Sequence, residues 1–349
     1  MQEQAGEPPR QSGGEDPHGV NPYTAGGVPN PTLREDEGAE LRFQSAPRRP
    51  RIWPSLVMPL LSLLTFFTAS IVMVGVAFYV VHGELDRQIL TSSDAMKTVS
   101  ASRVGFILLI VMPQLALVLP CVVAAFLSPV PTAKRLSLVR GHWPLWAWAA
   151  AAMATPLIGW ISSIVVGSFM VESENLKLMS DIFRGHGESG FLIPLALMIG
   201  ATPAVCEELL FRGFIQTRLN RSIGPTVGII LSSLLFALFH MDWVHIIAVL
   251  PLGLYLGCVA WRSGSLFPAM LGHFVNNTIS VFAVVLGPQR DAELPSAQMI
   301  LFVLAVVAAA LVGIVLTAIA FWRLPLPDST LPRDDADLEL AMGQATVIS

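Results

Sequence analysis

Charged side chains are scarce in this chain. Only 13% of its 349 residues are Asp, Glu, Lys or Arg, whereas 53% are hydrophobic. A soluble domain of this size needs considerably more charge to cover its surface. The composition therefore excludes an ordinary soluble protein.

Cysteine is rare as well, because Cys121, Cys206 and Cys258 are the only three and each lies in an apolar stretch. An odd number of cysteines in such positions does not indicate a disulfide framework. The sequence also has no GxSxG element, which marks one large class of serine hydrolases, and no HExxH element, which marks many zinc proteases. Neither of these enzyme classes is indicated.

Between its charged stretches the chain has eight apolar segments. Their lengths suit helices that cross a bilayer core of about 30 Å at about 1.5 Å per residue. The segments are expected at Trp53 to His82, Val104 to Ser128, Trp143 to Met170, Phe191 to Leu219, Gly224 to His240, Val244 to Trp261, Leu266 to Gly287 and Ala297 to Trp322. The sequence predicts an all-α fold, a polytopic helical membrane bundle of about eight transmembrane helices.

Basic residues fall in alternate loops between these segments. They precede the first segment, separate the second from the third and follow the fourth: Arg48, Arg49, Arg51, Lys134, Arg135, Arg140, Arg218 and Arg221. Cytoplasmic loops of membrane proteins are enriched in Lys and Arg. The pattern predicts a multi-pass protein of the cell membrane with both termini in the cytoplasm.

Two adjacent carboxylates lie within the fourth apolar segment. An ionised group at the centre of a transmembrane helix costs about 2.5–3.5 kcal/mol, so such residues usually face a bundle interior or a wet cavity and have a function. Glu208 and Arg212 are four residues apart on one helix face, where Arg212 can neutralise Glu208. Glu207 is rotated about 100° away and is the candidate general base. A purely structural ion cluster is the alternative.

Two further pairs at helical spacing carry histidine. Phe236 and His240 share a face in the fifth segment, and His273 and Asn277 share one in the seventh. A single histidine in an apolar helix is more often a hydrogen-bonded packing residue than a catalyst. Together with two buried carboxylates, however, the histidines indicate a catalytic cluster.

These residues resemble the CAAX prenyl protease and bacteriocin-processing (CPBP) family of intramembrane endopeptidases, whose pattern is EExxxR, then FxxxH, then HxxxN or HxxxD. The resemblance covers roughly residues 191–287. It implies that Glu207 activates a water molecule, that His240 holds or protonates it, and that His273 with Asn277 stabilises the oxyanion. The remaining residues of the pattern, Glu208, Arg212 and Phe236, would support the site.

The composition and the apolar segments, together with the resemblance, predict a division of the chain. We expect a disordered cytoplasmic tail at 1–52, transmembrane helices at 53–190, a catalytic helical core at 191–287, a last transmembrane helix at 288–322 and a second disordered cytoplasmic tail at 323–349. The expected partners are the lipid bilayer and a membrane-associated protein or peptide substrate, and no nucleic acid.

The involvement of a metal stays open. A carboxylate and two histidines form the ligand set of many catalytic zinc sites. Glu207, His240 and His273 are therefore candidate ligands for zinc, although metal-free chemistry is favoured.

Two other classes of function remain as alternatives. A proton-coupled transporter would use Glu207, Glu208 and His240 as an intramembrane proton relay. Transporters often have internal repeats, and the EELLFR segment has no convincing counterpart in the first four spans. A catalytically silent scaffold or immunity protein would keep the same residues and bind a partner without cleaving it.

Overall fold

The computed structural model describes residues 51–287 and 296–326, and within these ranges the regular structure is helical. The helices, including two π-helical segments η1 and η2, are α1 Trp53–His82, α2 Arg87–Leu90, α3 Ser93–Ala101, α4 Arg103–Phe126, α5 Thr132–Arg135, α6 Leu145–Phe169, α7 Glu174–His186, η1 Gly187–Phe191, α8 Leu192–Glu208, η2 Leu209–Gln216, α9 Thr217–Ile223, α10 Pro225–Leu238, α11 Trp243–Ser263, α12 Phe267–Leu286 and α13 Ala297–Arg323. The predicted all-α fold is confirmed. The predicted tails lie almost wholly outside the described residues.

Seven helical stretches among the described residues are long and apolar enough to cross a membrane. They correspond to seven of the eight predicted segments, and the protein is an integral, multi-pass membrane protein. The remaining prediction, Gly224 to His240, is α10, which has only 14 residues. At about 1.5 Å per residue α10 spans roughly 21 Å, less than a bilayer core. The apolar sequence continues to the turn after α10, so the predicted segment was longer than the helix.

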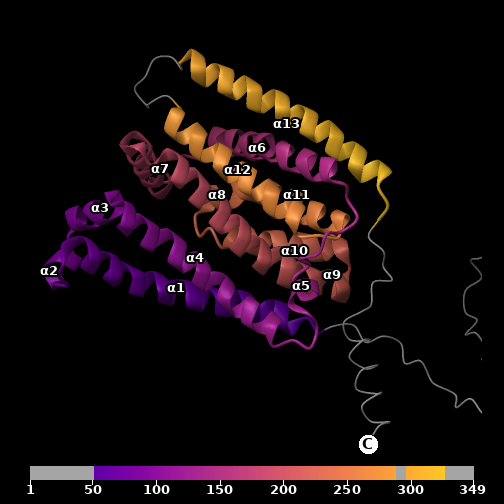
Figure 1. Ribbon diagram of the computed structural model, residues 1–349, viewed down its shortest axis with the longest axis horizontal. Coiled ribbons are helices and arrows are strands. Elements are labelled where there is room, and N and C mark those ends of the chain that lie inside the picture. The colour runs from indigo at the N-terminus through magenta and orange to yellow at the C-terminus, as the bar shows by residue number, and fades with distance from the viewer. Residues whose placement is uncertain (1–50, 288–295, 327–349) are drawn as a thin grey trace, which may run out of the picture. The chain divides into compact units, whose positions relative to one another are not determined.

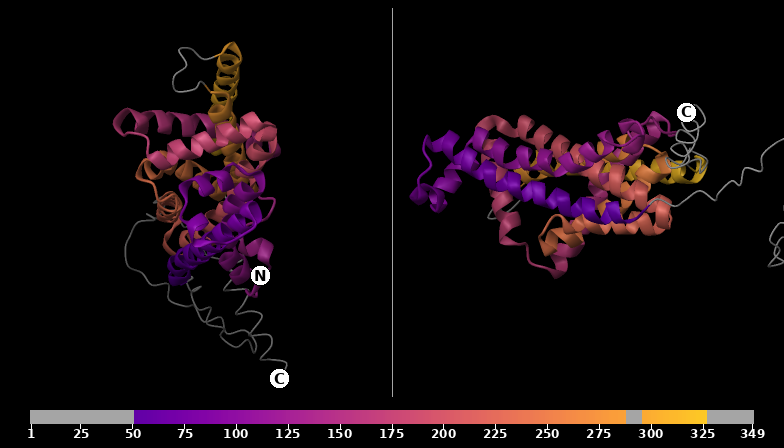
Figure 2. Two further views of the ribbon diagram at one scale, coloured as in Figure 1. Left: turned by 90° about the vertical axis from the view of Figure 1, so that its left-hand side faces the viewer. Right: turned by 90° about the horizontal axis from the view of Figure 1, so that it is seen from below.

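The helices pack in three groups (Figure 1). The neighbours α1 and α4 form one side, and α6 and α13 form the opposite side. Between them lie α8, α10, α11 and α12, and α12 packs on both α6 and α8. Seen from the side of α1 in Figure 2, right, this helix runs across the front of the central helices.

Close helix packing sets the distance between α8 and α12, which carry most of the predicted site. A Cβ atom on Gly200 of α8 would collide with the side chains of Thr278 and Phe274 on α12. On its other side α12 is held by α6, where the Thr155 hydroxyl donates a hydrogen bond to the Gly272 carbonyl at 2.9 Å. These contacts fix α12 next to the centre of α8.

The helix that begins with α8 changes its winding directly after the two carboxylates. Residues 209–216 form the π-helical segment η2, and the chain then continues as α9. A π-helical turn widens the helix and is frequent at functional sites. The two sequence neighbours Glu207 and Glu208 therefore lie at the junction of α8 and η2.

A tight turn joins α10 to α11. Met241 has a positive φ of 54°, and Asp242 then caps α11 by accepting a hydrogen bond from the backbone N–H of His245 at 3.1 Å. Asp and Asn are among the preferred residues at this position. His240 thus lies two residues beyond the end of α10, at the start of this turn.

Candidate active site

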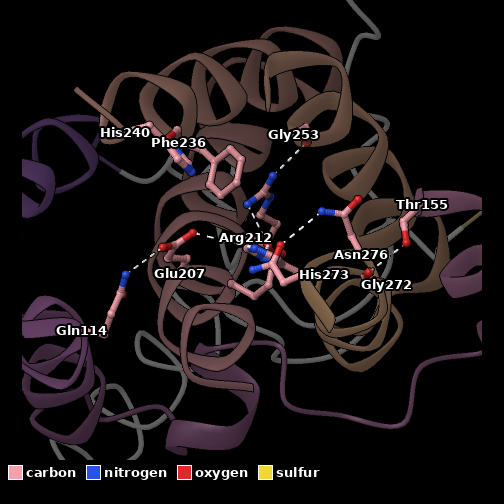
Figure 3. Close-up of polar contacts among 12 residues, drawn as sticks. Gln114, Thr155, Glu207, Arg212, Phe236, His240, Gly253, Gly272, His273 and Asn276 are labelled. Atoms are coloured by element: carbon pink, nitrogen blue, oxygen red, sulfur yellow. Dashed lines mark hydrogen bonds and ion pairs between the residues drawn. The ribbon is translucent and has the colours of Figure 1, made fainter. Parts of the chain in front are cut away.

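The ion pair expected from the EExxxR spacing is present in the buried interior. Arg212 Nη1 donates to Glu208 Oε1 at 2.8 Å, and both side chains are fully buried. Arg212 Nη2 donates to the Gly253 carbonyl of α11 at 2.9 Å. The guanidinium thus joins the α8–η2 junction to α11, as Figure 3 shows.

Phe236 forms the centre of an aromatic and cationic cluster. The Arg212 guanidinium lies over its ring, 4.3 Å from the centroid. The rings of His240 and His273 pack edge-on against it, with centroids at 5.1 and 5.7 Å. Phe236 therefore separates the two imidazoles and keeps both close to the ion pair.

His240 is held in one tautomer by the backbone. Its Nδ1 lies 3.1 Å from the Phe236 carbonyl oxygen. Because a carbonyl only accepts hydrogen bonds, Nδ1 carries the proton, and in the neutral ring Nε2 is left as an acceptor. The His245 ring packs against His240 with centroids 4.5 Å apart.

His273 lies between the two carboxylates. Its Nδ1 is 3.0 Å from Glu208 Oε1, and its Nε2 is 3.9 Å from Glu207 Oε2. The structure therefore brings Glu207, Glu208 and His273 together from two helices that are far apart in sequence.

Asn277 lies one helical turn beyond His273 and is bonded elsewhere. Its Oδ1 accepts a hydrogen bond from Asn276 Nδ2 at 3.1 Å, and its own Nδ2 donates to the Ile199 carbonyl at 3.4 Å. These described hydrogen bonds do not join it to Glu207 or His273. Since Asn276 occupies Oδ1, the amino end of the Asn277 amide is the end that can serve an incoming acceptor.

Glu207 has a partner that sequence reasoning missed. Gln114 of α4 donates from Nε2 to Glu207 Oε1 at 3.1 Å (Figure 3). Arg212, as expected, makes its described hydrogen bonds to Glu208 and Gly253 instead. The signal in the sequence was an amide within the otherwise apolar run of α4, but nothing in the sequence linked it to Glu207.

A cavity of about 110 Å³ lies beside Glu207. It is lined by Leu63 and Phe66 of α1, Gln114 and Leu117 of α4, and Glu207, Phe211, Phe239, His240 and Met241. Three of these residues offer polar side-chain groups, and the other walls are apolar. A carboxylate and an imidazole thus face one small space with room for several water molecules.

The match to known families falls on this part of the chain. Residues 189–279 match the family described as type II CAAX prenyl endopeptidase, Rce1-like. They include the EExxxR, FxxxH and HxxxN elements. This segment is therefore similar to the Rce1-like family. The resemblance to CPBP intramembrane proteases that the three elements indicate is confirmed.

One curated protein is similar to this chain over a stretch about as long as the Rce1-like segment. The "Uncharacterized protein YpbD" of Bacillus subtilis (strain 168) is 31% identical over 91 residues, which cover 25% of this chain and 44% of that protein. The match thus spans less than half the length of that relative. No solved structure matches the chain.

The predicted metal ligands do not form a metal site in this arrangement. Among the described residues, no group of three or more His, Cys, Asp or Glu side chains is placed to hold a metal ion. His273 uses Nδ1 to bind Glu208, and His240 uses Nδ1 to bind a backbone carbonyl, so a metal could be bound only through the Nε2 atoms of these rings. Glu207, His240 and His273 are thus not placed as three protein ligands of one zinc ion in this arrangement, and the mechanism proposed from these residues assigns no step to a metal.

Proposed function

We propose that this chain is an intramembrane endopeptidase that hydrolyses a peptide bond of a membrane-associated protein or peptide. The observation that carries the proposal is the position of Glu207 beside a small, mostly apolar cavity that it shares with His240. Peptide hydrolysis needs a base for water, donors for the developing negative charge and exclusion of bulk solvent. Each requirement has a candidate group in this site.

In the proposed reaction Glu207 removes a proton from a water molecule, whose oxygen attacks the carbonyl carbon of the scissile bond. The neutral His240 ring accepts a hydrogen bond from that water at Nε2, because its Nδ1–H is used by the Phe236 carbonyl. The tetrahedral intermediate then collapses, the C–N bond breaks, and the proton held by Glu207 passes to the leaving amine. Water is consumed, and an acid and an amine are released.

The oxyanion of the intermediate is assigned to His273 and Asn277. A protonated His273 donates from both ring nitrogens. Its Nδ1–H then remains bonded to Glu208, while Nε2–H points to the side of Glu207. The amino group of Asn277 approaches from the next turn of α12. Glu208, Arg212 and Phe236 hold these groups in place.

Replacement of Glu207 by Gln tests the mechanism, because glutamine keeps the volume but cannot act as a base. We expect Glu207→Gln to lower the turnover of a membrane-presented peptide in liposomes by about 100- to 10,000-fold. Glu84→Gln, which changes an exposed loop carboxylate, is the matched control. Unchanged turnover in Glu207→Gln would remove the proposed role of Glu207. A wild-type protein that captures the peptide without cleaving it would instead be a scaffold.

A further inference from the structure

Gln114 is a polar side chain within the otherwise apolar helix α4. From Val104 to Phe126 it is the single amide or charged side chain of the helix. Its Nε2 donates to Glu207, but its Oε1 is buried and has no hydrogen-bond partner among the described residues. A buried polar atom without a partner costs free energy that a methionine or leucine would not. The described hydrogen bond of this amide is therefore its contact with Glu207.

The contact with Gln114 occupies one of the two carboxylate oxygens of Glu207. Oε1 accepts from Gln114 at 3.1 Å, and Oε2 lies 3.9 Å from His273 Nε2. A carboxylate bound at one oxygen cannot turn freely about its last torsion angle. Oε2 is then the oxygen left to take a proton from water.

We propose that Gln114 is a positioning residue for the general base, fixing the Glu207 carboxylate so that one defined oxygen meets the water. The proposal rests on the catalytic role proposed for Glu207. Gln114 lies in α4, outside the Rce1-like segment of residues 189–279, so this part of the site is supplied by the preceding helices. The α4 helix packs directly on both α8 and η2.

Gln216 offers a matched control within the same protein. It is also a buried glutamine, it donates from Nε2 to a backbone carbonyl of α11, that of Gly257, at 2.8 Å, and its Oε1 also lacks a described partner. Gln114→Met and Gln216→Met thus each remove one buried amide and one hydrogen bond while keeping nearly the same side-chain length. Only the first of them touches Glu207.

The experiment compares wild type, Glu207→Gln, Gln114→Met and Gln216→Met in liposomes. For Gln114→Met we expect kcat to fall about 10- to 100-fold, since a small misplacement of a reacting group has an effect of this size. KM should change by less than about twofold, because substrate binding is retained. Gln216→Met should keep both constants close to wild type.

Difference infrared spectroscopy gives a readout that does not depend on turnover. The carboxyl band that disappears in Glu207→Gln identifies Glu207. This band should shift in Gln114→Met, where its hydrogen bond is lost, and stay in place in Gln216→Met.

Folded Gln114→Met with a wild-type kcat and an unshifted band overturns the positioning role. If that variant does not fold, Gln114→Asn replaces it, because its shorter amide no longer reaches Glu207, and a wild-type kcat again overturns the role. Full activity in Glu207→Gln would instead overturn the proposed function itself, so the two failures are distinguishable.

Discussion

Arg212 shows how a single charge can be held in an apolar bundle. Its guanidinium binds Glu208 and the Gly253 carbonyl and covers the Phe236 ring. Lysine could not make these contacts together, because its point charge lacks the planar fork of arginine. Glu208 in turn also binds His273. Loss of Arg212 would therefore disturb the positions of Glu208 and, through it, of His273.

Arg212→Met should destabilise the protein by about 3–5 kcal/mol, because it leaves the buried Glu208 carboxylate without its cation. The double variant Glu208→Gln with Arg212→Met should recover much of this loss, since no uncompensated charge remains. Thermal unfolding in detergent micelles measures both. Equal stability of wild type and Arg212→Met would contradict the assigned role of the ion pair.

Residue spacing predicted the contacts between residues that are four positions apart in the sequence. Glu208 with Arg212, and Phe236 with His240, are each four positions apart, and both pairs are in contact. Residue spacing could not predict contacts between different helices. The bond from Gln114 to Glu207 depends on how α4 packs against α8, and no periodicity within either helix contains that information.

For Asn277, residue spacing predicted the helix face but not the hydrogen-bond partners. It shares a helix face with His273, as its spacing indicates, yet it bonds to Asn276 and to the backbone of α8. The role proposed for Asn277 is therefore a hydrogen bond that its amino group would donate only when the oxyanion forms.

Among the elements, the turn between α10 and α11 is held by the Asp242 cap. Hydrogen bonds from the Ser173 side chain and from the backbone N–H of His245 lower the pKa of the Asp242 carboxyl below its ordinary value. A carboxyl whose pKa is lowered by folding stabilises the protein above the unfolded-state value, about 3.9, and the contribution is lost as the pH falls through the folded-state value. The turn is therefore weakened in acid.

Asp242→Ala should lower the free energy of unfolding by about 0.5–2 kcal/mol at pH 7, the usual cost of losing an N-cap. The difference from wild type should begin to shrink below about pH 4, where the carboxyl of the unfolded chain binds a proton, and should shrink further as the pH falls through the lowered folded-state pKa. Thermal unfolding at pH 7 and pH 3 checks both points, with the exposed loop variant Asp86→Ala as the control. A difference of the same size at both pH values would show that the ionised carboxyl is not responsible.

Long apolar elements were predictable, and short polar ones were not. The segment predicted at Trp53 to His82 agrees with α1 at both ends, because Pro54 lies in its first turn and Gly83 ends it with a left-handed conformation. The small helices α2, α3 and α5 escaped prediction, since pieces of 4 to 9 residues are too short for a repeated apolar pattern. The π-helical winding of η2 has no sequence signal of its own.

At the scale of the whole molecule, the short α10 does not change the side on which the chain ends. α10 and α11 are joined by a tight turn and pack against each other, so the chain returns to the face that it left. The hairpin therefore counts as an even number of crossings, whatever depth its tip reaches. The other six long helices also make an even number of crossings.

Both ends of the described bundle, Trp53 and Arg323, are thus expected on one side of the membrane, and the basic loops predict that this side is the cytoplasm. Reporter fusions at each terminus test this, using a phosphatase active only outside the cytoplasm and a fluorescent protein that matures only inside it. We expect fluorescence and no phosphatase activity at both termini. Opposite results at the two termini would refute the hairpin topology.

The contribution of α4 has a practical consequence for protein engineering. Anyone who transplanted residues 189–279 into an unrelated membrane host would carry over the acids and imidazoles but leave Gln114 behind. One oxygen of Glu207 would then meet whatever the host presents there, whether a lipid chain or a stray solvent molecule. A graft built to cleave peptides should therefore carry α4 along as an integral part, or rebuild an amide donor at the same place.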